Sequence, residues 1–100
     1  MTTREILIAA RKRIEDPNDW GKARGEYPSE AGKITIVNAC WLDGTDWSER
    51  RDAHSALRAQ IPEGGYLADF NDNHTHDEVL ALFDRAIEEL LKKGAQHDDS

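Results

Sequence analysis

The sequence predicts a mainly α, single-domain fold of three to four helices, with a long loop in the N-terminal half. Two observations carry this prediction: three segments share the same helix-start pattern, and apolar side chains at helical spacing follow each one. The chain has 100 residues, of which 38% are hydrophobic and 33% charged, as in one small folded domain. We expect a single helical domain over residues 1–95 and an acidic flexible tail over residues 96–100.

Each helix start places an oxygen-bearing side chain three residues before a glutamate. Side chains at this spacing can satisfy the backbone N–H groups that lack partners in the first turn of a helix. The pairs are Thr2 with Glu5, Asp46 with Glu49, and Thr75 with Glu78.

Helix-breaking residues close each of the three segments. The first helix should end before Pro17, because the residue preceding a proline avoids the α region. The second should stop at Pro62 and the third at Gly94, since glycine suits the position after a helix end. The predicted core side chains are Ile6, Leu7, Ala10, Ile14, Ala53, Ala56, Leu57, Ile61, Val79, Leu80, Phe83, Ala86, Ile87, Leu90 and Leu91.

The segments between these helices are harder to assign. Residues 17–33, rich in Gly, Pro and charge, predict a long loop. Residues 34–42 form a near-continuous apolar run with β-branched members, so either a buried helix or a short β element at 34–40 fits. The only candidate partner strand is 65–70. Residues 70–78 predict a polar, acidic loop before the last helix.

The formal net charge is −7, and most of the excess lies in the second half of the chain. Residues 1–50 carry nine acidic side chains against eight basic ones, and residues 51–100 carry eleven against five. Because phosphate backbones are bound through Lys and Arg, this balance argues against direct nucleic-acid binding and favours a protein partner with a basic surface. No apolar run approaches the roughly 20 residues of a membrane span, and no signal peptide is visible, so we expect a cytoplasmic protein.

Three short strings lie around the third helix start: Asn71-Asp72, Thr75-His76-x-Glu78-Val79 and Phe83-Asp84-Arg85-Ala86-Ile87. Together they resemble the C-terminal motif of a small family of bacterial and phage proteins known only as a domain of unknown function. The resemblance covers residues 69–91 best. Elsewhere Trp20 resembles a tryptophan after the family's first helix, and Cys40 with Leu42 resembles part of its Cys-Ala-Leu-Gly-Ala helix, although Asp43 replaces the glycine. The resemblance implies a mostly helical fold and no established activity.

Two patterns resemble metal sites without meeting their requirements. Alternating oxygen side chains between Asp69 and Asp77 imitate a calcium-binding loop, but His74 and Leu80 stand where that loop needs glycine and a bidentate glutamate. His74 and His76, with one cysteine in the chain, lack the paired spacing of zinc ligands. We therefore expect neither a metal nor a cofactor.

An enzyme is the main alternative to a binding protein. Cys40, His76 and Asp72 could form the centre of a small thiol- or metal-dependent enzyme if the fold brought them together. Cys40 lies in an apolar run, however, where a buried and unreactive thiol is the usual outcome. We expect no enzymatic activity.

The favoured interpretation is a non-enzymatic, acidic protein-binding module. Acidic side chains around two helix starts, at residues 46 and 75, would form one patch if these starts lie side by side, and Trp41, Trp47 and Tyr66 would flank it. Such a patch could occupy the basic, nucleic-acid-binding surface of a host complex, such as a defence system, in the manner of a phage or mobile-element inhibitor. A self-associating structural protein is a further alternative, suggested by the broad apolar face of the last helix. The predicted partner-binding residues are Asp43, Asp46, Glu49, Asp69, Asp72, Asp77, Glu78 and Trp47.

Overall fold

The computed structural model describes residues 2–21, 34–62 and 65–98, and five helices occupy this part of the chain. They are α1 (Thr3–Arg13), α2 (Ile36–Ala39), α3 (Trp47–Arg58), α4 (Leu67–Asn73) and α5 (His76–Asp98). The mainly α fold class is confirmed, with one helix more than the three to four predicted.

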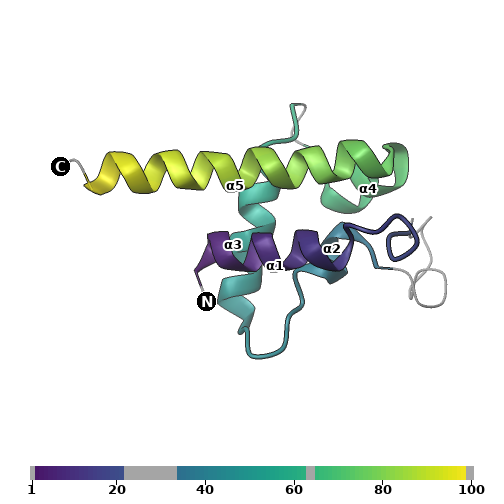
Figure 1. Ribbon diagram of the computed structural model, residues 1–100, viewed down its shortest axis with the longest axis horizontal. Coiled ribbons are helices and arrows are strands. Elements are labelled where there is room, and N and C mark those ends of the chain that lie inside the picture. Colours follow the sequence, from purple (N-terminus) through teal and green to yellow (C-terminus); the bar gives the residue numbers. More distant parts are fainter. Residues whose placement is uncertain (1, 22–33, 63–64, 99–100) are drawn as a thin grey trace.

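The longest helix, α5, organises the packing. Figure 1 shows α1 running antiparallel to it, α3 crossing both, and α4 folded back against the start of α5. The helices α1, α3 and α5 contact one another pairwise, and their apolar stripes meet in one core. The fully buried large side chains include Ile6, Leu7, Ile14, Ile36, Leu57, Val79, Leu82 and Phe83.

All three predicted helix starts are confirmed as reciprocal capping pairs. The backbone N–H of Glu5 donates to Thr2 Oγ1 over 3.1 Å, while the Thr2 N–H donates to Glu5 Oε1 over 2.8 Å. The same exchange joins Asp46 with Glu49, over 2.8 and 3.0 Å, and Thr75 with Glu78, over 3.2 and 2.9 Å. Local side-chain chemistry therefore fixes where α1, α3 and α5 begin.

The predicted end of the last helix is wrong. α5 continues through Gly94 to Asp98, so residues 96–98 of the predicted loose tail are helical, and residues 99–100 lie outside the described residues. A glycine inside a helix costs only about 1 kcal/mol relative to alanine. The good helix formers on both sides of Gly94 offset this cost.

The predicted acidic loop before α5 is also wrong, because residues 67–73 form α4. Leu67, Phe70 and Asn71 lie three and four residues apart, and all three are buried on one face of this helix. The burial of that face outweighs the low helix propensity of the Asp and Asn residues. Of residues 67–98, only His74 and Thr75 are non-helical.

The ambiguous segment 34–42 forms the short helix α2 with little β structure. Thr35 caps α2 by accepting from the Asn38 N–H over 3.3 Å. The β character is limited to one parallel bridge between Trp20 and Ile34, in which the Gly21 N–H donates to the Ile34 carbonyl over 3.2 Å. Most of the predicted 17–33 loop lies outside the described residues.

One buried side chain holds three separate segments together. Asn71 Oδ1 accepts from Trp20 Nε1 over 2.8 Å and from the Ile36 N–H over 3.1 Å. Its Nδ2 donates to the Gly21 carbonyl over 3.1 Å. Asn71 therefore fixes the start of α2 beside α4, and α2 leads into one side of the site described below.

Candidate functional site

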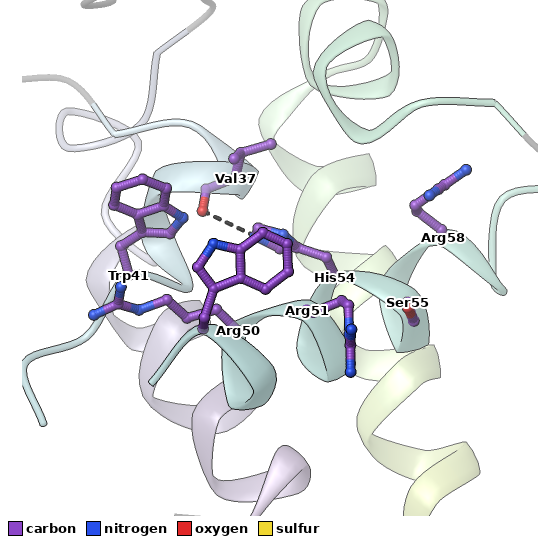
Figure 2. Close-up of a pocket in the computed structure, with 8 residues that line it drawn as sticks. Val37, Trp41, Arg50, Arg51, His54, Ser55 and Arg58 are labelled. Atoms are coloured by element: carbon purple, nitrogen blue, oxygen red, sulfur yellow. Dashed lines mark hydrogen bonds between the residues drawn. The ribbon is translucent and has the colours of Figure 1, made fainter. Parts of the chain in front are cut away.

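The outward side of α3 carries a basic and aromatic surface. A pocket of about 300 Å³ opens there, lined by residues of α3 and of the segment around α2 (Figure 2). Three of the large apolar side chains that remain exposed border or adjoin it: Trp41, Trp47 and Tyr66, which are 53%, 74% and 69% exposed. We call this surface the aromatic–arginine face; it consists of Val37, Trp41, Trp47, Arg50, Arg51, His54, Ser55, Arg58 and Tyr66.

Helical periodicity explains why these side chains gather. Positions 47, 51, 54, 55 and 58 fall on one stripe of α3, while Ala53 and Leu57 fall on the opposite stripe and are fully buried. Because burial of Ala53 and Leu57 fixes how the helix is rotated, it also fixes the outward stripe of tryptophan, arginine and histidine.

Hydrogen bonds hold the second wall of the pocket against α3. His54 Nε2 lies 3.2 Å from the Val37 carbonyl, which joins α3 to α2 (Figure 2). Arg13 Nη1, from α1, donates to the carbonyls at the end of α2 over 3.0 Å, and to the Trp41 carbonyl over 3.2 Å. The position of Trp41 is thus set by contacts from two other helices.

Arg50 braces the turn that joins Trp41 to α3. Its Nε donates to Thr45 Oγ1 over 2.8 Å, and its Nη2 donates to the Leu42 carbonyl over 3.4 Å. The turn itself needs Gly44, whose φ of 84° is in the left-handed region that favours glycine. The wall formed by Trp41 is therefore preorganised before any ligand binds.

Three arginines lie over three aromatic rings. The guanidinium carbon of Arg50 is 5.4 Å from the centre of the Trp41 ring, and that of Arg51 is 5.9 Å from the Trp47 ring. Arg58 lies 5.6 Å from the ring of Tyr66. Such cation–π contacts order long side chains while leaving their N–H groups available for an acceptor.

Two of these arginines have no acidic partner among the described residues. Neither Arg51 nor Arg58 forms an ion pair with an acidic side chain in the described residues. The chain has 20 acidic residues against 13 Lys and Arg residues, so its surface as a whole is acidic while this face is basic. Guanidinium groups beside aromatic rings suit a ligand that combines an anionic group with an apolar one.

The acidic residues predicted to bind a partner fall in two separate places. Asp43, Asp46 and Glu49 lie at or just before the start of α3, at the lower edge of the molecule in Figure 1. The second group belongs to α4 and the first turn of α5, at the upper right. The two helix starts are therefore not side by side. The second group comprises Asp69, Asp72, Asp77 and Glu78.

Three of the predicted acidic residues, Asp46, Glu49 and Glu78, already cap helix starts. The carboxylates of Glu49 and Glu78 accept the backbone N–H of their cap residues, and these hydrogen bonds hold the pKa of both carboxyl groups below the usual value. Of the predicted partner-binding residues, Trp47 is the one that lines the pocket.

The residues proposed for thiol chemistry are buried in the core or form hydrogen bonds within and between helices. Cys40 is fully buried, and burial raises the pKa of its thiol to about 12, far from that of a reactive thiolate. His76 Nε2 lies 2.6 Å from the Ile14 carbonyl and ties the start of α5 to the end of α1. Asp72 Oδ1 accepts from Asn71 Nδ2 over 3.4 Å.

Neither a metal cluster nor a membrane span is found within the described residues. No group of three or more His, Cys, Asp or Glu side chains there is arranged to hold a metal ion. None of the helices in that part of the chain is long and apolar enough to cross a membrane. His74 instead stacks on Phe70, with ring centres 3.8 Å apart, and its Nδ1 lies 2.9 Å from the Phe70 carbonyl.

The arginine and histidine members of the aromatic–arginine face were not predicted from the sequence. A signal for them exists in the second predicted helix, where Trp47, Arg51, His54 and Arg58 recur at three- and four-residue steps opposite the apolar stripe. The contributions of Val37 and Trp41 have no such signal, because they depend on the packing of α2 beside α3.

Comparisons with curated proteins and with solved structures find no match. The profile of a family of unknown function, DUF6197, matches residues 1–89, which include α1 to α4, most of α5 and the whole aromatic–arginine face. This match confirms the resemblance to an uncharacterised family inferred from the strings around the start of α5. The chain belongs to this family of unknown function, DUF6197.

Proposed function

We propose that the chain is a non-enzymatic protein-binding module that contacts its partner through the aromatic–arginine face. The observation that carries this proposal is the pocket of about 300 Å³ with three arginine–aromatic pairs around or beside it. Tryptophan, tyrosine and arginine are the residue types enriched at the energetic centres of protein interfaces. Exposing three large aromatic side chains is unfavourable in water unless a partner covers them.

The rigidity of the face supports the same proposal. The pocket wall at Trp41 is held by Arg13 and Arg50, and the wall at His54 is held by the Val37 carbonyl. Binding loses less conformational entropy when the contact residues are already ordered, so such a face favours affinity. The burial of Cys40 supports binding over thiol catalysis.

A second version of the binding proposal places the partner on the acidic residues. In this version the chain is a phage or mobile-element inhibitor that mimics nucleic acid, and the net charge of −7 is its support. The separation of the two acidic groups in Figure 1 makes a single large contact with both less favourable. The experiment below distinguishes the two versions.

Partner capture with matched variants tests the proposal. Wild-type protein, a W47A/R51A/R58A variant and a D69N/D77N variant would be immobilised and incubated with lysate of the native host, and retained proteins would be identified by mass spectrometry. All five substituted side chains are exposed, so the fold should persist, and circular dichroism would check this.

We expect a protein retained by wild type and by D69N/D77N, and lost by W47A/R51A/R58A. A partner lost only by D69N/D77N would favour the acidic inhibitor. A partner that both variants retain would contradict the aromatic–arginine face as the contact surface.

A further inference from the structure

We propose that the aromatic–arginine face takes an acidic protein segment that carries a bulky apolar side chain and two carboxylates at least about 10 Å apart. The inference rests on the proposed function and names the chemistry of the partner. It follows from the charge, the spacing and the size of the site.

The charge of the site calls for an anion. Arg51 and Arg58 are exposed, line the pocket and lack an acidic partner among the described side chains. Their guanidinium groups present paired N–H donors that match the two oxygens of a carboxylate. A carboxylate at each arginine would satisfy both the charge and the donors.

The spacing calls for two anionic groups instead of one. Arg51 and Arg58 are seven residues apart on α3, which separates their Cα atoms by about 10 Å along the helix axis. In Figure 2 the Arg51 side chain points downward and the Arg58 side chain points upward, so their guanidinium groups diverge. One small anion cannot contact both, whereas a peptide segment with two acidic residues can.

The pocket beside the arginines calls for an apolar side chain. Val37, Trp41 and Trp47 line this pocket and offer aromatic and aliphatic surface. A volume of about 300 Å³ is at the lower limit of small-molecule pockets, which span roughly 300–1,000 Å³. It therefore suits one inserted side chain, such as leucine or phenylalanine, better than a large cofactor.

The charges around the face favour an acidic peptide over nucleic acid. Asp43, Asp46 and Glu49 lie next to the Trp47 end of the face, and the whole chain carries a net charge of −7. A nucleic-acid strand carries a charge at every phosphate and would extend over these carboxylates. A peptide can place its two acidic residues over the arginines and none beyond them.

Selection from a random peptide library tests the inference. The library, displayed on phage, would be selected on immobilised wild-type protein, and the enriched peptides would be synthesised with a fluorescent label. Anisotropy titrations would then compare wild type with R51A/R58A and W47A. R85A is the matched control, because Arg85 is an exposed arginine on α5 that does not line the pocket.

We expect enriched peptides that combine a bulky apolar residue with two Asp or Glu residues. Their Kd should rise at least tenfold in R51A/R58A and in W47A, stay unchanged in R85A, and rise with salt in wild type. Replacing the two acidic residues of the peptide by Asn or Gln should weaken binding by a similar factor.

Three results would overturn the inference, and they differ in what they leave of the proposed function. Peptides that need the face but lack acidic residues would refute the proposed partner chemistry and keep the face as a protein-binding surface. A labelled single-stranded oligonucleotide that binds the face more tightly than every selected peptide would make nucleic acid the occupant. Enriched peptides that bind all variants equally would refute the face itself.

Discussion

Replacing Asn71 by alanine should strongly destabilise the fold, although Asn71 is a polar residue in a segment that resembles a loop in the sequence. The substitution removes the hydrogen bonds that join α4 to Trp20, Gly21 and Ile36. Asn71 is fully buried, so water cannot replace its amide without rearrangement of the core. Loss of this side chain releases the start of α2 and, with it, one wall of the pocket.

The magnitude follows from the three hydrogen bonds. Each intramolecular hydrogen bond contributes about 1 kcal/mol, and a buried group left unpaired adds about 1–3 kcal/mol. The bonds to Trp20 and Gly21 count about 1 kcal/mol each and the unpaired backbone N–H of Ile36 about 1–3 kcal/mol, so N71A should lower the free energy of unfolding by about 3–5 kcal/mol. This is a large part of the roughly 5–15 kcal/mol that stabilises a domain of this size.

Urea denaturation followed by far-UV circular dichroism measures the effect. With a slope of about 2 kcal/mol per molar urea, the N71A midpoint should fall by about 2 M. N73A is the matched control, since Asn73 lies on the same helix, is exposed, and bonds only within it, to the Asp69 carbonyl. It should cost no more than about 0.5 kcal/mol.

A third variant separates the contributions. W20F removes the Nε1–H donor to Asn71 together with part of a ring that packs against the core, so it should cost about 1–3 kcal/mol. Equal lowering of the urea midpoint by N71A and N73A would show that Asn71 does not hold the three segments together.

Three other predictions concern the thiol, the helix caps and the turn before α3. Cys40 should react with a thiol reagent only after unfolding, because it is fully buried; rapid reaction of native protein would contradict its place in the core. The pKa values of Glu5, Glu49 and Glu78 are lowered, chiefly by the hydrogen bond each carboxylate accepts from the backbone of its cap residue. The stabilisation from these carboxylates is therefore complete above the ordinary glutamate pKa and lost as the pH falls through the lowered pKa values. Thermal unfolding at stepwise pH between about 5 and 3 should show a falling melting temperature. The triple Glu→Gln variant should show a smaller fall. G44A should cost about 1 kcal/mol in urea unfolding, because a Cβ there meets no atom within 4 Å and only the backbone is strained; no change would contradict the left-handed turn.

The parts of the fold that depend on local chemistry could be predicted from the sequence. A capping pair acts within four residues, so the starts of α1, α3 and α5 are visible without any tertiary information. The stripe that buries Val79, Phe83 and Ala86 is visible for the same reason. Much of the broad apolar face that suggested self-association is thus occupied by the core.

The fourth helix could not be predicted, because no local signal marks it. Tyr66 precedes α4 without a capping hydrogen bond from its side chain, and Asp69, Asn71 and Asn73 all have low helix propensity. The helix exists because Asn71 finds partners about 35 and 50 residues earlier in the chain. Sequence patterns over a short window contain no information about such contacts.

Only the aromatic side chains of the candidate site were expected at a partner surface. Trp41, Trp47 and Tyr66 were grouped with acidic residues instead of with the arginines. In the structure Trp47 lines the pocket together with Arg51 and Trp41. A count of charges along the sequence does not reveal that one helix of an acidic protein carries a stripe of basic side chains.

Hydroxyl-radical footprinting of the complex with the captured partner tests whether that partner covers the aromatic–arginine face. Trp41, Trp47 and Tyr66 are exposed in the free protein, and Leu91, 53% exposed on α5, serves as an internal control away from the face. Binding of the partner should lower oxidation of the three aromatic side chains several-fold and leave oxidation of Leu91 unchanged. Unchanged oxidation of the aromatic residues in a saturated complex would show that the partner does not cover this face.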